Sequence, residues 1–366
     1  MMFLKSVKSA KHIAATLAIA AALIFANGAS HASDPFKVGF IYVGPIGDHG
    51  WSYQHDQARL AVEEHFGDKV TTAYVENVPE GADAERVLDQ LVAAGNQLIF
   101  STSFGFMNPT LKVAKRNPDI LFEHATGFKT ADNVGIYNAR FYEGRYVAGQ
   151  TVAKLTKSNI IGYIASFPIP EVVMGVNATL RGARAVNPDV EIRVVWVNSW
   201  FDPGKEADAA KTLIDQGADI IMQHTDSPAP MQVAQERGVW AVGQASDMSS
   251  FGEDAHVTAI VNNWAPYYIE RIQAAIDGNW SVDSTWGGFQ SGMLYLSDFN
   301  KGIPENIVAE ARALEAKIKA GEVHPFQGPV IDQNGNERLA AGEIMDDRTI
   351  NSMDYFVEGV IGTVPN

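Results

Sequence analysis

Apolar and polar residues alternate along the chain in two recurring patterns. Short runs of β-branched and aromatic residues predict buried parallel strands, and longer segments with apolar residues three and four positions apart predict helices. In the first half, strands are predicted at 38–43, 70–76, 97–101 and 120–124, and helices at 52–65, 82–94 and 109–116. Strands that alternate with helices in this way build an open parallel sheet with helices on both faces.

The second half of the chain repeats this order. Three pairs of segments match at nearly one offset: 38–46 with 161–169, 74–100 with 196–222, and 113–114 with 233–234. The second copy has predicted strands at 160–165, 191–197, 220–224 and 240–243, and predicted helices at 174–186, 204–216 and 230–237. Repetition on this scale predicts two similar α/β lobes, each with its own sheet.

The start of the chain does not follow the repeat. Three lysines precede an apolar run at 13–26. Ser30 and Ala32 are the small residues at positions −3 and −1 relative to a cleavage site after Ala32. This pattern predicts a secretory signal peptide over residues 1–32. A membrane anchor is the weaker alternative, because the apolar run is shorter than the roughly 20 residues that span a bilayer.

The end of the chain has two readable segments. Residues 304–322 have a strongly helical pattern, and 326–343 predict a β-hairpin with its turn at 334–336. Residues 332–337 resemble a calcium-binding loop only in part, and a plain turn is the favoured interpretation. We expect both segments to pack on the second lobe.

The composition narrows the class of protein. Of 366 residues, 46% are hydrophobic and 19% charged, which is enough to bury a large core and excludes a disordered chain. The net charge of −15 argues against a nucleic-acid partner, because phosphate contacts need clustered lysine and arginine. Without cysteine, the exported chain has no disulfide and no site for lipid attachment, so we expect it free in the periplasm of a Gram-negative cell.

Enzyme signatures are absent from the sequence. It has no G-x-S-x-G, H-E-x-x-H or P-loop motif and no cysteine nucleophile, and no G-x-G-x-x-G follows the first strand. The nine histidines lack metal-ligand spacing; Asp48, His49 and His55 come nearest to it. The sequence therefore predicts a binding protein rather than an enzyme, with no cofactor and no metal.

Candidate ligand-binding residues gather in the loops that follow the predicted strands. Ligands of open α/β sheets bind beyond the carboxyl ends of the strands, and two facing lobes would place these loops around one cleft. The loops are 44–51, 101–108, 125–128, 166–171, 198–203, 224–229 and 244–249. Their candidate residues are Asp48, His49, Trp51, Phe104, Phe106, Thr126, Phe167, Glu171, Asn198, Trp200, Asp202, His224, Asp226 and Asp247.

These residue types favour a flat, uncharged ligand. Aromatic faces stack on flat ligands or sugars, and carboxylates accept from N–H or O–H donors. Cations are scarce in the loops, which disfavours a phosphorylated ligand. Each residue alone also has a plain structural interpretation: an aromatic ring packs in the core, Asp202 starts a helix after a turn, and Asp247 caps one. The binding hypothesis depends on the whole set meeting at one end of both sheets.

Four segments of the chain form an ordered set of motifs. They are GPIGDHGWSYQHDQAR at 44–59, FYEGRYVAGQTVA at 141–153, NSWFDPGKEADAA at 198–210 and VGQASDMSS at 242–250. They resemble, in order, the D-D-K-x-F-N…G, E-G-S-Y-L-A-G, G-S-W-x-D-P-x-K and I-G-V-D-x-D-Q motifs of the BMP (basic membrane protein) family. This family consists of substrate-binding proteins of ABC importers and includes purine nucleoside receptors. The likeness extends from about Lys37 to beyond residue 292.

The resemblance implies a type I periplasmic binding fold. In this α/β fold, two doubly wound parallel-sheet lobes are joined by three hinge strands around a cleft that closes on its ligand. The implied lobes are 36–140 plus 264–288 and 141–263 plus 289–366. We further expect a monomer that delivers a small-molecule purine to an ABC permease in the inner membrane.

The resemblance also implies a purine stacked between aromatic rings. Trp51 falls on the Phe of the first motif and Asp48 on its second Asp. Phe104 lies where the family has a G-F-x-F loop, and Trp200 is the expected ring of the second lobe. The predicted ligand-binding residues are Trp51, Asp48, Phe104, Phe106, Phe167, Trp200, Asp226, Asp247 and Trp264.

Two departures from the family motifs change the expected ligand. The nucleoside receptors hold ribose hydroxyls with the first Asp of G-V-D-x-D and with a Lys in T-S-V-x-K, where this chain has Ala245 and Asn262. Buried hydroxyls without partners are costly, and Trp264 would fill the space of a sugar. We therefore predict a free nucleobase, with adenine first and Asp226 or Asp247 accepting from its exocyclic amine. The alternatives are a purine nucleoside receptor, a ligand-dependent sensor on the same fold, and a nucleoside hydrolase.

Overall fold

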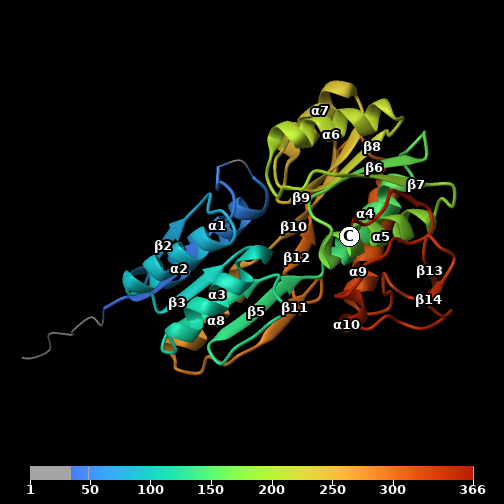
Figure 1. Cartoon of the computed structure of the whole chain (residues 1–366). Helices are drawn as coiled ribbons and strands as arrows, with labels where there is room; N and C mark the ends of the chain where they lie inside the picture. Colours follow the sequence, from blue (N-terminus) through green and yellow to red (C-terminus); the bar gives the residue numbers. More distant parts are fainter. Residues whose placement is uncertain (1–33, 48, 366) are drawn as a thin grey trace, which may run out of the picture. The chain divides into compact units, whose positions relative to one another are not determined.

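The computed structural model describes residues 34–47 and 49–365 (Figure 1). The predicted signal peptide at 1–32 and the candidate Asp48 lie outside these residues. None of the helices in the described part of the chain combines the length and apolar character needed to cross a bilayer.

One sheet has six strands in the order β11-β5-β4-β3-β1-β2. All of its pairings are parallel. The strands are β1 Phe36–Ile41, β2 Val70–Val75, β3 Leu98–Ser101, β4 Leu121–Ala125, β5 Val134–Ala139 and β11 Ser284–Gly287. The four strands predicted from apolar runs in this half are confirmed, and their ends shift by one or two residues.

The other sheet has seven strands in the order β12-β10-β9-β8-β6-β7-β15. They are β6 Ile160–Ala165, β7 Glu191–Trp196, β8 Ile220–His224, β9 Trp240–Ala245, β10 His256–Asn262, β12 Leu294–Leu296 and β15 Val360–Ile361. β12 runs antiparallel to β10, and the other pairings are parallel. β9 extends beyond its predicted end at 243, because Gln244 and Ala245 still pair with β10.

Helices cover both faces of each sheet. On the first they are α1 Gly50–Phe66, α2 Ala82–Ala93, α3 Met107–Arg116 and α8 Ala265–Ile276; on the second they are α4 Phe141–Ala153, α5 Pro170–Arg184, α6 Pro203–Asp215, α7 Ala229–Arg237 and α9 Glu305–Lys319. Neighbouring strand residues point to opposite faces, so Phe40 packs with residues of α1 and α8, while Ile41 packs with residues of α2 and α3. α5 begins four residues before its predicted start, because Pro170 is well suited to the first turn of a helix.

The described chain passes between the two sheets three times. It leaves the first sheet between β5 and α4, returns between β10 and α8, and leaves again between β11 and β12. The strand membership of the sheets fits lobes of 36–140 plus 264–288 and 141–263 plus 289–366, and we keep these bounds as a proposal.

The end of the chain packs on the second sheet. The predicted helix is α9, and the predicted hairpin is the antiparallel pair β13 Val330–Ile331 and β14 Glu337–Leu339. A short helix, α10 Asp347–Ile350, follows before β15 joins the edge of β7. The Arg181 guanidinium of α5 donates to three backbone carbonyls of residues 325–329. Figure 1 shows this segment, coloured red, beside α5 and α9.

Candidate functional site

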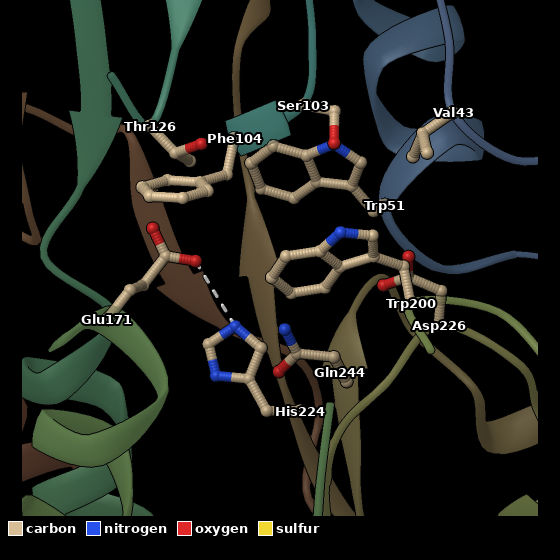
Figure 2. A pocket seen from close by; sticks show the side chains of 10 residues that line it. All are labelled: Val43, Trp51, Ser103, Phe104, Thr126, Glu171, Trp200, His224, Asp226 and Gln244. Carbon is tan, nitrogen blue, oxygen red and sulfur yellow. Dashed lines mark ion pairs between the residues drawn. The ribbon is translucent and has the colours of Figure 1, made fainter. Parts of the chain in front are cut away.

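A pocket lies at the carboxyl ends of both sheets and has about 330 Å³ of space free of protein atoms, part of it open to solvent (Figure 2). Its lining residues are Val43, Trp51, Ser103, Phe104, Thr126, Glu171, Trp200, His224, Asp226 and Gln244. Nine of these ten residues lie in the loops predicted from the ends of the strands, and Val43 directly precedes the first of them. The rule that parallel strands present their ligands at the carboxyl ends therefore located the pocket.

Two tryptophans present their faces to the pocket. Figure 2 shows the indoles of Trp51 and Trp200 one above the other, with the Phe104 ring beside Trp51. The polar edge of each indole is already occupied: Trp51 Nε1 donates to the Thr102 carbonyl at 2.5 Å, and Trp200 Nε1 donates to Glu80 Oε1 at 3.2 Å. The ring faces are thus fixed in orientation and left apolar, which suits a flat ligand between them.

Asp226 supplies a buried carboxyl group at one side of the pocket. The side chain lies beyond the end of β8, and only 8% of the residue is exposed. Burial raises the pKa of Asp226 well above its usual range, and the negative charges of Glu206 and Glu171 raise it further. The backbone N–H of Trp51 donates to this carboxyl and acts in the opposite direction. This one donor does not offset the effect of burial on the charged form.

Glu171 supplies a second carboxyl group from the first turn of α5. Figure 2 shows it on the opposite side of the pocket from Asp226. Its Oε2 accepts from Asn138 Nδ2 at 2.8 Å, and its Oε1 lies 3.3 Å from His224 Nε2. Burial lowers the pKa of His224, and Glu171 only partly offsets this effect. A neutral imidazole that donates from Nε2 to Glu171 fits this arrangement.

Gln244 reaches the pocket from the end of β9, where the backbone makes a tight turn. The Ser246 N–H donates to the Gln244 carbonyl at 2.7 Å, and Ala245 between them has φ 60°. This is the rare form of γ-turn, which is strained for a residue with a Cβ. The turn directs Gln244 into the pocket and Ser246 towards α1.

Four hydrogen bonds between described residues link segments of the two sheets around the pocket. The Gly50 N–H donates to Ser246 Oγ at 2.7 Å, and the Trp51 N–H donates to Asp226. The other two are Asn138 to Glu171 and Trp200 to Glu80. Gly50 packs against the Asp226 backbone so closely that an added Cβ would lie 2.2 Å from its carbonyl oxygen. In this conformation the cleft is closed over the pocket.

The predicted site residues divide into three groups. Trp51, Phe104, Trp200 and Asp226 line the pocket. Phe167 and Trp264 lie one layer behind: the Phe167 ring contacts Trp200 at 4.9 Å, and Trp264 meets Trp51 edge-on at 5.5 Å. Phe106 is fully buried among residues of α2 and α3, and Asp247 is half exposed beside His256, 3.6 Å away. Neither of these two is among the lining residues, and Asp48 is outside the described residues.

Six lining residues are missing from the predicted set. Glu171, His224 and Thr126 were candidates from their loops, but no sequence signal favoured them over their neighbours. The sequence gives no reason to select Val43 or Ser103, which are small or apolar, and Gln244 is the first residue of the predicted loop 244–249. For Gln244, one signal was available: it is a polar residue near the end of the apolar run WAVGQA. No cluster of metal-ligating side chains is found among the described residues.

The comparison with known proteins decides the family. The model of the PnrA-like ABC transporter substrate-binding proteins matches residues 36–325. The chain belongs to this family. It is 56% identical to a purine-binding protein of Brucella abortus (strain 2308), over 93% of this chain and 97% of the relative. It is 38% identical to a protein of Haloferax volcanii provisionally named an ABC transporter glucose-binding protein, over 93% of this chain and 84% of that one.

The likeness extends to solved structures. An ABC transporter solute-binding protein of Aeropyrum pernix K1 superposes with a TM-score of 0.68 at 21% identity, over 79% of this chain and 93% of the other. This agreement confirms the type I periplasmic binding fold, with two doubly wound sheets. As a PnrA-like substrate-binding protein, the chain is a non-enzymatic, extracytoplasmic binder of a small molecule that works with an ABC permease.

Proposed function

We propose that this PnrA-like protein binds a free purine nucleobase, adenine above others, for an ABC importer. The observation that carries the proposal is the pair of indoles, Trp51 and Trp200, whose polar edges are occupied and which present apolar faces to the pocket (Figure 2). A purine is flat and aromatic, so it gains stacking contacts on both of its faces. The purine-binding relative from Brucella abortus supports the same class of ligand.

The two carboxyl groups favour a base over a nucleoside. Asp226 and Glu171 lie on opposite sides of the pocket, and carboxylates accept hydrogen bonds. Free adenine carries N–H donors at opposite ends, the exocyclic amine and the ring N–H of its imidazole. A nucleoside has replaced the ring N–H by the bond to ribose, so one carboxyl would lose its donor. The loss would cost most at Asp226, because Glu171 already accepts from Asn138 and faces His224 Nε2.

The residues expected at the ribose positions lie outside the pocket lining, and Trp264 does not fill the space of a sugar there. Ala245 and Asn262 are fully buried and do not line the pocket. Trp264 is also buried, with its ring stacked on His55 at 4.8 Å behind Trp51. None of the three offers a charged group to sugar hydroxyls.

One observation favours a purine nucleoside as the second candidate. A larger cavity, with about 1080 Å³ of atom-free space, lies next to the pocket and shares Phe104, Thr126 and Glu171 with it. A ribose that extends past Glu171 would find room there. The cavity is lined further by Asn138, Ser284 and Thr285, which can bond to hydroxyls.

We also propose the cellular setting from the sequence. The mature chain begins after Ala32, is not lipidated, and is a periplasmic monomer that docks on a permease in the inner membrane. The net charge of −15 for the full sequence, which loses three lysines and no acidic residue on removal of 1–32, supports the absence of a nucleic-acid partner.

Calorimetric titration tests the proposed ligand. The protein is first unfolded and refolded to remove any bound ligand, then titrated with adenine, guanine, hypoxanthine, adenosine, inosine and glucose. We expect free bases to bind more tightly than their nucleosides, with adenine first. Tighter binding of adenosine or inosine would support the nucleoside receptor instead. Binding of glucose alone would show that the ligand follows the Haloferax relative and would refute the purine assignment.

A further inference from the structure

We propose that the buried Arg145 fixes the amide of Gln244 so that Gln244 Nε2 donates a hydrogen bond to a ring nitrogen of the ligand. Gln244 is then a specificity-determining residue and Arg145 a positioning residue. The inference rests on the proposed purine function and specifies how that site distinguishes one ring acceptor from the others.

Arg145 lies beneath the pocket. It projects from α4 and is completely buried, and its guanidinium reaches the carboxyl ends of β8 and β9. Nη2 donates to the Gln223 carbonyl at 2.7 Å and also to Gln244 Oε1. The guanidinium carbon lies 5.5 Å from the centre of the Tyr163 ring.

The chemistry of arginine decides which way the amide of Gln244 points. A guanidinium has only N–H donors and no acceptor. The amide oxygen of Gln244 must therefore face Arg145, because the reverse orientation would set N–H groups against N–H groups. Figure 2 shows the result: the Gln244 nitrogen points towards Trp200 and the interior of the pocket, and its oxygen points away. Only 1% of the residue is exposed, so the amide is held within the protein apart from its edge that faces the pocket.

The other charged and imidazole groups of the pocket make this donor distinctive. Asp226 and Glu171 are carboxyl groups, and His224 Nε2 is directed at Glu171. Gln244 Nε2 is thus placed to meet an acceptor on the ligand, while the carboxyl groups meet donors. A purine base has this combination, with ring nitrogens that accept beside N–H groups that donate. A sugar hydroxyl both donates and accepts, so it needs no fixed amide.

Stability alone does not explain Arg145. Burial lowers the pKa of its guanidinium, and its Nε and Nη1 have no hydrogen-bond partner among residues 34–47 and 49–365. A buried charge that is poorly paired costs folding free energy. A role in fixing the ligand-facing amide gives this charge a function.

Deaza analogues of adenine test the inference, because each replaces one ring nitrogen acceptor by C–H. Calorimetry would compare 1-, 3- and 7-deazaadenine with adenine on wild type, Gln244→Met, Gln244→Glu and Arg145→Met. On wild type, we expect one analogue to bind about tenfold more weakly than adenine or worse, as expected for a lost buried hydrogen bond. On Gln244→Met, the ratio of the affinity for adenine to the affinity for that analogue should fall to about twofold or less, since the Nε2 donor is gone.

The two other variants separate positioning from packing. Gln244→Glu keeps the shape and still accepts from Arg145 with one oxygen, but it places an acceptor where Nε2 was, so it should fold well and lose the ratio. Arg145→Met frees the amide to turn, so the ratio should shrink even where the melting temperature is unchanged. Gln232→Met, at an exposed glutamine on α7, is the matched control and should keep the wild-type ratio.

Each outcome has a separate meaning. A wild-type protein that binds no purine refutes the proposed function. A wild-type protein that binds adenine and all three analogues alike, or a Gln244→Met ratio equal to that of wild type, refutes the role of Gln244. A ratio that persists in Arg145→Met refutes the positioning role of the arginine.

Discussion

At the scale of the residue, the protonation state of Asp226 that favours folding differs from the one that favours binding. Burial raises the pKa of Asp226 in the folded protein, so folding favours the protonated carboxyl. The contribution of this group to stability is complete below its unfolded pKa and is lost as the pH rises through its folded pKa. At neutral pH the charged form therefore costs stability, and a ligand N–H that donates to it recovers part of that cost.

Asp226→Asn should make both effects measurable. Because asparagine stays neutral, the refolded, ligand-free variant should melt at a higher temperature than wild type at about pH 8, and the difference should shrink towards about pH 4. The variant should bind adenine about tenfold more weakly, because a charged hydrogen bond becomes a neutral one. The affinity of wild type for adenine should rise with pH as Asp226 ionises, and the variant should lose this rise. A variant that is less stable than wild type at about pH 8 would contradict this account of the buried charge.

Trp200 provides a direct test of stacking. Trp200→Ala removes one of the two facing rings, and stacking of a base on an aromatic side chain contributes about 1–3 kcal/mol. We expect the affinity for adenine to fall about tenfold or more, with little change in the denaturation midpoint. Trp196→Ala is the control, since Trp196 lies on β7, donates to the Thr363 carbonyl and stacks on Phe356 outside the pocket. Trp196→Ala should lower stability and leave the affinity for adenine unchanged. If Trp200→Ala instead lowers stability and leaves the affinity unchanged, Trp200 is a packing residue.

At the scale of the element, the N-terminus of α1 meets the loop after β8 across the pocket. Gly50 has φ 82° and packs directly on the Asp226 carbonyl. Its N–H also donates to Ser246 Oγ, beyond the strained turn at Ala245. A glycine is needed here both for the left-handed backbone and for the close approach of the two lobes.

Gly50→Ala should therefore prevent closure. The added methyl group would lie 2.2 Å from the Asp226 carbonyl oxygen in the closed form, whereas separated lobes leave it room. We expect ligand affinity to fall by about tenfold or more, and small-angle scattering to show that adenine no longer reduces the radius of gyration. Gly47→Ala is the matched control in the same loop, because an added Cβ there meets no atom within 4 Å. A variant that closes and binds like wild type would refute a closing contact at Gly50.

At the scale of the whole molecule, the end of the chain is part of the structure of the second lobe. β15 extends the second sheet at β7, and Phe356 is 1% exposed with its ring stacked on Trp196. Asn177 of α5 holds the same segment by donating to the Tyr355 carbonyl and accepting from the Val357 N–H. The segment lies outside the pocket lining, so it should stabilise the lobe without taking part in recognition.

Phe356→Ala tests whether the end of the chain contributes to stability but not to ligand binding. Removal of a buried aromatic side chain typically costs about 3–5 kcal/mol, which should appear as a lower midpoint in chemical denaturation. Adenine affinity at a temperature where the variant is folded should stay within about twofold of wild type. A loss of affinity in the folded variant would instead connect the end of the chain to the binding site.

The sequence alone determined the repeating α/β order, the two sheets and the edge at which the pocket lies. Strands such as 160–165 and 220–224 were predicted at their observed ends, because hydrophobic periodicity and the rule for carboxyl ends act locally and survive in one dimension. It also selected Trp51, Trp200 and Asp226, since large rings and lone carboxylates are unusual in loops.

Only the tertiary structure decided which loop residues meet. Phe106 and Phe104 are two positions apart, yet one is in the core and the other lines the pocket, because a single helical turn directs them to opposite sides. Arg145 and Gln244 are separated by 99 positions, and no local pattern links a helix residue to a distant strand end. Their contact depends on how α4 packs on the second sheet, and the orientation of the Gln244 amide follows from that contact.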